Sequence, residues 1–231
     1  MTIEVLAAEE SAIGMICLRR RQVPGAPDQS AFEITVDHQF LMSSLVTASE
    51  CALAEIALEL CAATAPRILI GGLGLGYTAQ AALASPRTRA VEVVELLPAV
   101  IGWFERGLYP VADALRADRR LVITPGDVYR RLLAPPTSQF DAILIDVDTS
   151  PERRLDEVSV PFYGAAGLRA CSQHLAPGGV LGVWSAAESP EFEQVLDAVF
   201  ERVRTVPIDF ENAMLSEPET NWLYFASSPR A

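Results

Sequence analysis

A glycine-rich loop is the first feature of the sequence that could take part in chemistry. Residues 70–76, Ile-Gly-Gly-Leu-Gly-Leu-Gly, follow a predicted strand and open a predicted helix. Glycines let a ligand approach bare backbone, and the first turn of a helix offers it free N–H groups. Residues 74–79 also fit the dinucleotide-binding pattern G-x-G-x-x-A. The glycines predicted to hold a nucleoside cofactor are Gly71, Gly72, Gly74 and Gly76.

Acidic residues after the next two predicted strands extend this site. Glu95 ends the second strand, where a carboxylate can accept both hydroxyl protons of a ribose. That role suits NAD and S-adenosyl nucleosides equally. Asp127 follows the third strand and can accept from an adenine amino group, while the backbone N–H of Val128 donates to the ring.

Two further acids, Asp146 and Asp148, end the fourth predicted strand. Ligands of open α/β sheets bind at such strand ends. A dehydrogenase has no general need for carboxylates beside its nicotinamide, whereas a sulfonium cofactor or an amine nucleophile can be held by them. Asp146 and Asp148 are therefore candidate catalytic residues. Tyr163 follows the same loop and could line an acceptor pocket, although packing at a helix start explains it equally well.

The strands that must position these side chains are apolar runs of strand length. They fall at Arg67–Ile70, Val91–Glu95, Leu121–Thr124, Phe140–Asp146 and Val180–Trp184. Helix-like stretches separate them, at Tyr77–Leu83, Pro98–Arg106, Val128–Leu133 and Tyr163–His174, and another precedes them at Ser49–Leu60. This alternation predicts an α/β fold with a Rossmann-like parallel sheet covered on both faces.

The two ends of the chain do not follow this alternation of strands and helices. The β-prone runs Ile3–Leu6, Met15–Arg19 and Phe32–Val36 predict a small antiparallel sheet. We expect a β-rich subdomain over residues 1–46 and a nucleoside-binding domain over 47–231. After a helix at Pro190–Glu201, the runs Val203–Ile208 and Trp222–Ala226 predict an antiparallel C-terminal hairpin, because their connection is short for a helical crossover.

Composition limits the classes of partner. The formal net charge of −12 disfavours nucleic acid. Four cysteines without a C-x-x-C pair and two histidines suggest no metal site, and the cysteines are expected to be reduced thiols. No leader sequence and no apolar run of about 20 residues is found, so we expect a cytoplasmic protein with no membrane segment. An exposed edge of the N-terminal sheet makes a homodimer the expected assembly.

Several motifs in sequence order resemble the spermidine synthase (polyamine aminopropyltransferase) superfamily. They are the glycine-rich loop, Glu95, Gly126-Asp127, Phe140–Asp146 and Leu175–Val180. The resemblance covers roughly residues 30 to 226 and implies a class I methyltransferase fold preceded by a small β domain. It implies that the glycines form the cofactor loop, that Glu95 holds the ribose and Asp127 the adenine, and that Asp146 accepts a proton from an amine.

The sequence also departs from the superfamily pattern. Gly74 stands where aminopropyltransferases have an aspartate that binds the amine of decarboxylated S-adenosylmethionine. Thr149 stands where they have a second acid, although Asp148 is adjacent, and Ser49-Glu50-Cys51 replaces a tyrosine-histidine-acid segment. The methyltransferase pattern is also incomplete, with Ile70 in place of an acid before the loop. In detail the sequence resembles a bacterial branch of short spermidine-synthase-like proteins of unsettled activity.

The resemblance implies a transferase of the kind that acts in polyamine biosynthesis. Its cofactor would be S-adenosylmethionine or decarboxylated S-adenosylmethionine, and it would transfer an aminopropyl group to an amine acceptor. Methyl transfer from S-adenosylmethionine to a small molecule is an alternative. A NAD-linked oxidoreductase, which uses the same loop and Glu95, and a non-catalytic nucleoside-binding protein also remain open.

Overall fold

A seven-stranded sheet forms the centre of the computed structural model, which describes residues 3–11, 13–23, 26–147, 151, 161–212 and 217–230. The strand order is β10-β11-β9-β8-β5-β6-β7. The strands are β5 (Arg67–Gly71), β6 (Ala90–Glu95), β7 (Leu121–Pro125), β8 (Phe140–Ile145), β9 (Leu175–Ser185), β10 (Phe200–Asn212) and β11 (Glu217–Pro229). The five strands from β5 to β9 pair in parallel, which confirms the predicted α/β fold class.

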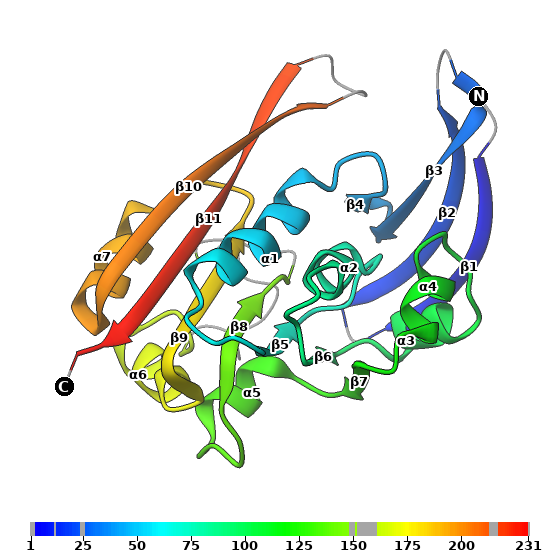
Figure 1. The fold of residues 1–231 in the computed structure, drawn as a ribbon. Helices are drawn as coiled ribbons and strands as arrows, with labels where there is room; N and C mark the ends of the chain where they lie inside the picture. Colours follow the sequence, from blue (N-terminus) through cyan, green and yellow to red (C-terminus); the bar gives the residue numbers. More distant parts are fainter. Residues whose placement is uncertain are drawn as a thin grey trace.

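Helices cover both faces of this sheet (Figure 1). They are α1 (Ala48–Leu60), α2 (Tyr77–Ala84), α3 (Pro98–Glu105), α4 (Ala112–Ala117), α5 (Val128–Leu133), α6 (Ala165–Ser172) and α7 (Pro190–Val199). Buried side chains of α1 to α4 share one hydrophobic core with Ile68 and Ile70 of β5. Those of α5 to α7 share a second core with Leu69 of the same strand. Successive residues of β5 thus face opposite cores, which explains its unbroken apolar run.

The N-terminal residues form a separate four-stranded antiparallel sheet in the order β1-β2-β3-β4. Its strands are β1 (Ile3–Ser11), β2 (Gly14–Val23), β3 (Ala26–Val36) and β4 (Gln39–Ser43). The expected sheet had only three strands. β4 was not predicted because no glycine marks the turn before it. The turn is formed by Asp37 and His38, with φ of 46° and 67°. Ile16 and Ile34 of this sheet join the first core, and the division at residue 46 remains a prediction.

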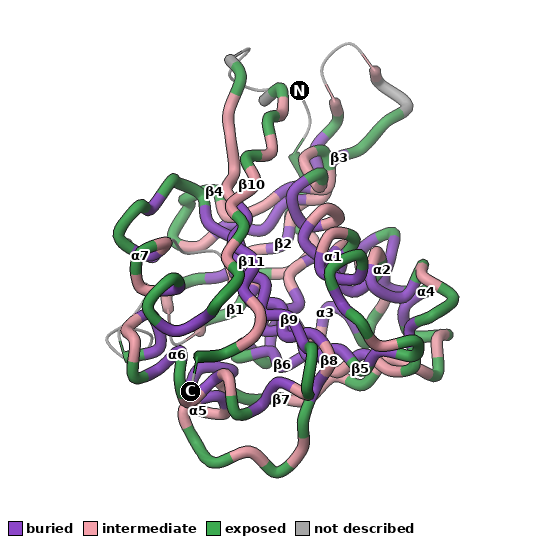
Figure 2. Tube along the Cα trace, turned by 60° about the vertical axis from the view of Figure 1, so that its left-hand side comes forward, coloured by how far each residue is buried: buried purple, intermediate pink, exposed green. Residues whose placement is uncertain are grey.

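The C-terminal hairpin is antiparallel, as predicted, and β11 also pairs antiparallel with β9. Both of its strands are longer than the apolar runs that predicted them. In Figure 1 the far ends of this hairpin and of the N-terminal strands project from the same side of the body. Figure 2 shows these projecting ends as mostly exposed or intermediate, whereas buried chain is concentrated below them.

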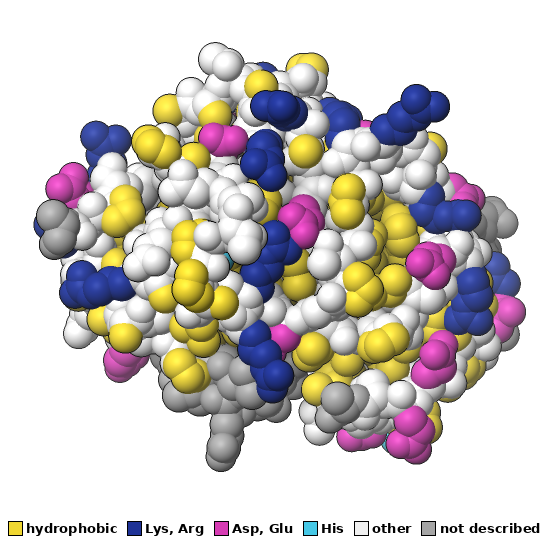
Figure 3. Space-filling view, turned by 90° about the horizontal axis from the view of Figure 1, so that it is seen from below, with side chains coloured by type: hydrophobic (Ala, Val, Ile, Leu, Met, Phe, Trp, Pro, Cys, Tyr) yellow, Lys and Arg dark blue, Asp and Glu magenta, His cyan; other side chains and the backbone are white. Residues whose placement is uncertain are grey.

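The molecular surface seen from below has basic, acidic and apolar side chains interspersed (Figure 3). Among the described residues, no helix has both the length and the apolar character needed to cross a membrane.

Candidate functional site

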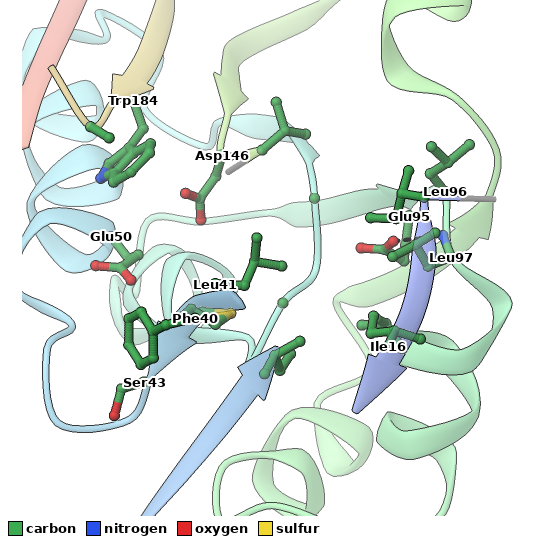
Figure 4. Close-up of a pocket in the computed structure, with 18 of the residues that line it drawn as sticks. Ile16, Phe40, Leu41, Ser43, Glu50, Glu95, Leu96, Leu97, Asp146 and Trp184 are labelled. Carbon is green, nitrogen blue, oxygen red and sulfur yellow. Dashed lines mark hydrogen bonds between the residues drawn. The ribbon is translucent and has the colours of Figure 1, made fainter. Parts of the chain in front are cut away.

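A pocket of about 600 Å³ lies at the carboxyl ends of the parallel strands. Its floor is the loop after β5 and the ends of β6, β7 and β8, and its walls come from the N-terminal sheet, the start of α1 and the C-terminal hairpin (Figure 4). The predicted site residues that line it are Gly72, Gly74, Glu95, Asp127, Val128 and Asp146. A volume of this size accommodates a small organic ligand.

The glycine loop packs against the end of β8. Gly72 has a φ of +93°, and a Cβ at this position would meet the carbonyl oxygen of Asp146. The Asp146 N–H donates to the Gly71 carbonyl oxygen at 2.8 Å. Gly71 and Gly76 do not line the pocket: a Cβ on Gly71 would lie 2.7 Å from Val128, and Gly76, with a φ of +85°, is the N-cap of α2. These two glycines shape the loop.

Glu95 connects the glycine loop to the end of β6. Its Oε2 accepts from the Leu73 N–H and its Oε1 accepts from the Leu97 N–H, both at 2.7 Å. Burial of the side chain raises the pKa of Glu95, and the backbone N–H groups act in the opposite direction. The backbone N–H groups of Leu96 and Gly74 also act on this carboxylate. A carboxylate oxygen can accept more than one hydrogen bond, so ligand hydroxyls could share it with these N–H groups. The expected ribose contact therefore remains a prediction compatible with this geometry.

Asp127 has a structural role that the sequence analysis did not anticipate. It is the N-cap of α5, and its Oδ1 accepts from the N–H groups of Tyr129 (2.8 Å) and Arg130 (3.1 Å). Its Oδ2 lies 3.4 Å from Arg130 Nε. Because the cap uses Oδ1, Oδ2 is the oxygen with more capacity for the predicted contact with an adenine amino group.

Asp146 lies across the pocket from Glu95 (Figure 4). Its Oδ2 accepts from the hydroxyl of Thr78, in the first turn of α2, at 2.5 Å. Burial raises the pKa of Asp146 to about 6, and the hydrogen bond from Thr78 acts to lower it. A carboxyl group with this pKa can hold a cation and exchange a proton near neutral pH. Thr78 could not be predicted as a partner of Asp146, because no spacing rule relates the two positions.

Glu50 is a further carboxylate in the pocket, and it was not among the predicted site residues. It belongs to the first turn of α1, and its Oε2 accepts from the hydroxyl of Ser49 at 2.8 Å. The Ser49 oxygen in turn accepts from Trp184 Nε1 (3.0 Å) and Asn221 Nδ2 (2.9 Å). One buried hydroxyl thus joins α1, the end of β9 and β11, and fixes Glu50 and Trp184 in the pocket wall.

Of the other two predicted catalytic residues, the structure describes only Tyr163. Asp148, like Thr149, lies outside the described residues. Tyr163 is 5% exposed, and its hydroxyl lies 2.8 Å from that of Tyr129. Its ring packs among Tyr129, Phe162 and Phe192 in the second core. The described pocket lining includes Tyr129 but not Tyr163, which supports packing as the reason for the residue.

The position of Gly74 bears on the cofactor. Its φ is +49°, and a Cβ here would lie 2.6 Å from the sulfur of Met42, a residue of β4 that lines the pocket. The space where the superfamily aspartate would begin is therefore filled by a thioether from the N-terminal sheet. Among the described lining residues, the acids are Glu50, Glu95, Asp127, Asp146 and Glu219 and the only base is Arg21, so the pocket favours a cationic ligand.

Comparison with known proteins gives sequence relatives as well as structural ones. No family model matches the chain. It is 32% identical over 120 residues to polyamine aminopropyltransferase 2 of Streptomyces coelicolor, a match that covers 51% of this chain and 21% of that protein. It is 29% identical over 123 residues to putrescine N-methyltransferase 3 of Nicotiana tabacum, covering 53% of this chain and 30% of that protein.

Two solved structures of spermidine synthases share the fold. One, in complex with the transition state analogue AdoDATO, has a TM-score of 0.73 at 20% identity and covers 96% of this chain and 73% of that chain. The other, from Thermotoga maritima, has a TM-score of 0.73 at 18% identity and covers 96% and 72%. The resemblance to the spermidine synthase-like superfamily is thereby confirmed.

The extent of the likeness differs between the sequence comparison and the structural comparison. The matched segments span less than a third of the length of the two curated relatives, whereas the structural match extends over nearly the whole chain. At 20% identity or below, the solved structures show the fold. The two curated relatives are named for different reactions, one an aminopropyl transfer and the other a methyl transfer.

Proposed function

We propose that the chain is a transferase that binds an S-adenosyl nucleoside and transfers the aminopropyl group of decarboxylated S-adenosylmethionine to an amine. The observation that carries the proposal is the placement of Glu95 and Asp146 on opposite sides of one pocket, with the glycine loop between them. The pocket has room for a nucleoside against Gly72, and apolar side chains of Val94, Leu97 and Val128 line the same region. The residues present therefore fit the proposed cofactor.

The sulfonium of the cofactor supplies a carbon that is already activated for displacement. The residues of this chain would position the two partners and handle one proton. Glu95 would accept hydrogen bonds from the ribose hydroxyls. Asp146, oriented by Thr78, would hold the ammonium of the acceptor and accept its proton. The amine lone pair would then form the new N–C bond as the C–S bond breaks, with that electron pair remaining on sulfur.

Methyl transfer is the second candidate, and one specific observation favours it. Met42 fills the place of the superfamily aspartate that binds the amine of decarboxylated S-adenosylmethionine. A putrescine N-methyltransferase is also among the sequence relatives. The pocket wall at Gly74 thus offers no acid that would distinguish the decarboxylated cofactor from the intact one. The arrangement of Glu95 and Asp146 suits both reactions.

Calorimetric titration with the three relevant nucleosides tests the proposal. Tighter binding of decarboxylated S-adenosylmethionine than of S-adenosylmethionine would support aminopropyl transfer, and the reverse preference would support methyl transfer. Methylthioadenosine reports on the nucleoside site alone. Glu95→Gln should weaken all three at least about tenfold, whereas Glu59→Gln, the same change on an exposed residue of α1, should not. Binding of NAD with no binding of S-adenosyl compounds would reject both candidates.

A homodimer and the division of the chain at residue 46 remain predictions. The edge strand β1 exposes Ile3 and Val5, at 51% and 58%, as a dimer through this edge would require. Sedimentation of the purified chain would test the assembly.

A further inference from the structure

One wall of the pocket is apolar over most of its length. It consists of Phe40, Leu41 and Met42 of β4 together with Leu45 and Val46 of the connection to α1. Residues 39–46 contain no acid and no base. Three further apolar side chains line the pocket, namely Ile13 from the turn before β2, Ile16 of β2 and Ile34 of β3. This wall offers contact to hydrocarbon and no charge to pair with a cation.

Part of this wall is uncovered. Phe40 is 51% exposed and Leu45 is 38% exposed, although most large apolar side chains of the chain are buried. Both residues line the pocket, so the solvent that they contact includes the pocket interior. Covering such surface with a ligand is favourable at about 25 cal/mol per Å² of apolar area. A ligand with an apolar body would gain this free energy, whereas a ligand that keeps its hydration shell would not.

Two carboxylates that could hold a cation, those of Glu50 and Asp146, line the same pocket close to this wall. In Figure 4, Glu50 lies between Trp184 and Phe40, and Asp146 lies beyond Leu41. Aromatic rings beside a carboxylate favour an ammonium that carries carbon substituents, since the rings contact both the charge and the hydrocarbon. Glu50 and Asp146 therefore give this end of the pocket the charge to hold an ammonium.

A second ammonium would find few partners along the apolar wall. The base Arg21 lines the pocket, and its guanidinium pairs with the buried Glu33 at 2.7 Å. Moving a charged group from water to an apolar surface without a partner is costly. Glu219, on β11, is the described acid that could offset this cost from the opposite wall. The competing arrangement is therefore a diamine that spans the pocket, with its second ammonium at Glu219.

We propose that the acceptor is a primary amine with a single cationic centre and an apolar alkyl or aryl body. Its nitrogen lies at Asp146 and Glu50, and its body lies against Phe40, Leu41 and Leu45. The inference rests on the proposed function insofar as the site takes an amine acceptor. It does not depend on which group is transferred, because in either reaction the nitrogen forms one N–C bond, one C–S bond breaks, and the nitrogen releases one proton.

The test compares the binding of two amines of equal length, 1-aminohexane and 1,6-diaminohexane. Their affinities are measured by calorimetry for the free protein and for the protein with methylthioadenosine. We expect 1-aminohexane to bind at least about tenfold more tightly, because its far end carries no charge to desolvate. Phe40→Ala should weaken 1-aminohexane binding several-fold, whereas Val122→Ala, which removes exposed apolar surface on β7 outside the pocket, should leave it unchanged.

Other outcomes would overturn the inference. Tighter binding of 1,6-diaminohexane, with the advantage lost in Glu219→Gln, would place a second ammonium at Glu219. Equal affinities, or no binding of either amine, would also reject an acceptor with an apolar body. Failure of the proposed function gives a different result, in which methylthioadenosine does not bind. The measurement on the free protein then still decides whether the apolar wall selects 1-aminohexane.

Discussion

The Thr78 hydroxyl donates to the Asp146 carboxylate at 2.5 Å and thereby joins the first turn of α2 to the end of β8. The same hydroxyl lies 3.3 Å from the Glu50 carbonyl oxygen in α1. Three elements that are distant in sequence therefore meet at one side chain. Because a charge-assisted hydrogen bond fixes both position and proton affinity, Thr78 sets where Asp146 points and how readily it is protonated.

Asp146→Asn should separate catalysis from nucleoside binding. The amide can still accept from Thr78, but it cannot take a proton from an ammonium. We expect turnover to fall by about a hundredfold or more, while the affinity for methylthioadenosine changes by less than about threefold. Steady-state assays and calorimetry measure the two quantities. Asp197→Asn, a change on the exposed surface of α7, is the matched control. Full turnover in Asp146→Asn would remove the residue from the mechanism.

The raised pKa of Asp146 predicts a pH dependence of activity. Since burial raises this pKa to about 6, the carboxylate that holds the ammonium is present above pH 6 and is lost below it. The acidic limb of the profile of kcat/KM against pH should therefore have its midpoint near pH 6. Thr78→Val removes the hydrogen bond that lowers the pKa, so the midpoint should move to higher pH. Thr220→Val, which removes an exposed hydrogen bond from Thr220 of β11 to Asp209, should leave it in place.

The same shift has a consequence for stability. The pKa of Asp146 is higher in the folded chain than its ordinary value of 3.8, so protonation favours the folded state. The contribution is fully present below pH 3.8 and is lost as the pH rises through about 6. Asp146→Asn should therefore raise the free energy of unfolding at pH 8 by about 1–3 kcal/mol relative to the native chain. Denaturant unfolding at pH 8 and pH 4 measures this difference, which should shrink at pH 4.

Much of the fold follows from local sequence signals. The apolar runs from Arg67 to Trp184 predicted the five parallel strands; β5, β6, β8 and β9 are largely buried, whereas β7 lies at the edge of the sheet with Val122 exposed. The short connection predicted the C-terminal hairpin. β4 and α4 were missed for local reasons. β4 follows a turn without glycine. α4 has only six residues and begins after Val111, with no side-chain N-cap, whereas the equally short α5 begins after the capping residue Asp127.

The candidate site could be predicted only in part. Glu95, Asp127 and Asp146 could be placed together because parallel strands end at the same edge of the sheet. Glu50, Trp184 and Asn221 could not, because they meet through Ser49 across 172 positions of sequence and no spacing rule relates them. Tyr163 follows the Asp146 loop in sequence, yet the described structure packs its ring into the core.

Ser49 gives a prediction about the acceptor side of the pocket. Its hydroxyl is buried and contacts Glu50, Trp184 and Asn221. Ser49→Ala should lower the free energy of unfolding by about 1–3 kcal/mol, because it leaves the buried Trp184 N–H and the part-buried Asn221 N–H without this acceptor. It should also raise the KM for the amine while the affinity for methylthioadenosine stays unchanged. Ser172→Ala, at the exposed end of α6, is the control. An unchanged KM would show that the cluster does not position the acceptor site.

Gly72 provides a test of the cofactor loop with a matched control in the same chain. Gly72→Ala places a Cβ against the carbonyl oxygen of Asp146 at a φ of +93°, so either the loop or the end of β8 must move. We expect methylthioadenosine binding to weaken by about tenfold or more and the free energy of unfolding to fall by more than about 1 kcal/mol. Gly102 lies within α3, where a Cβ would meet nothing within 4 Å. Gly102→Ala should therefore stabilise the chain by about 0.5–1 kcal/mol and leave nucleoside binding unchanged. Calorimetry and denaturant unfolding of both variants measure these effects, and equal behaviour of the two would contradict the tight packing of the loop against β8.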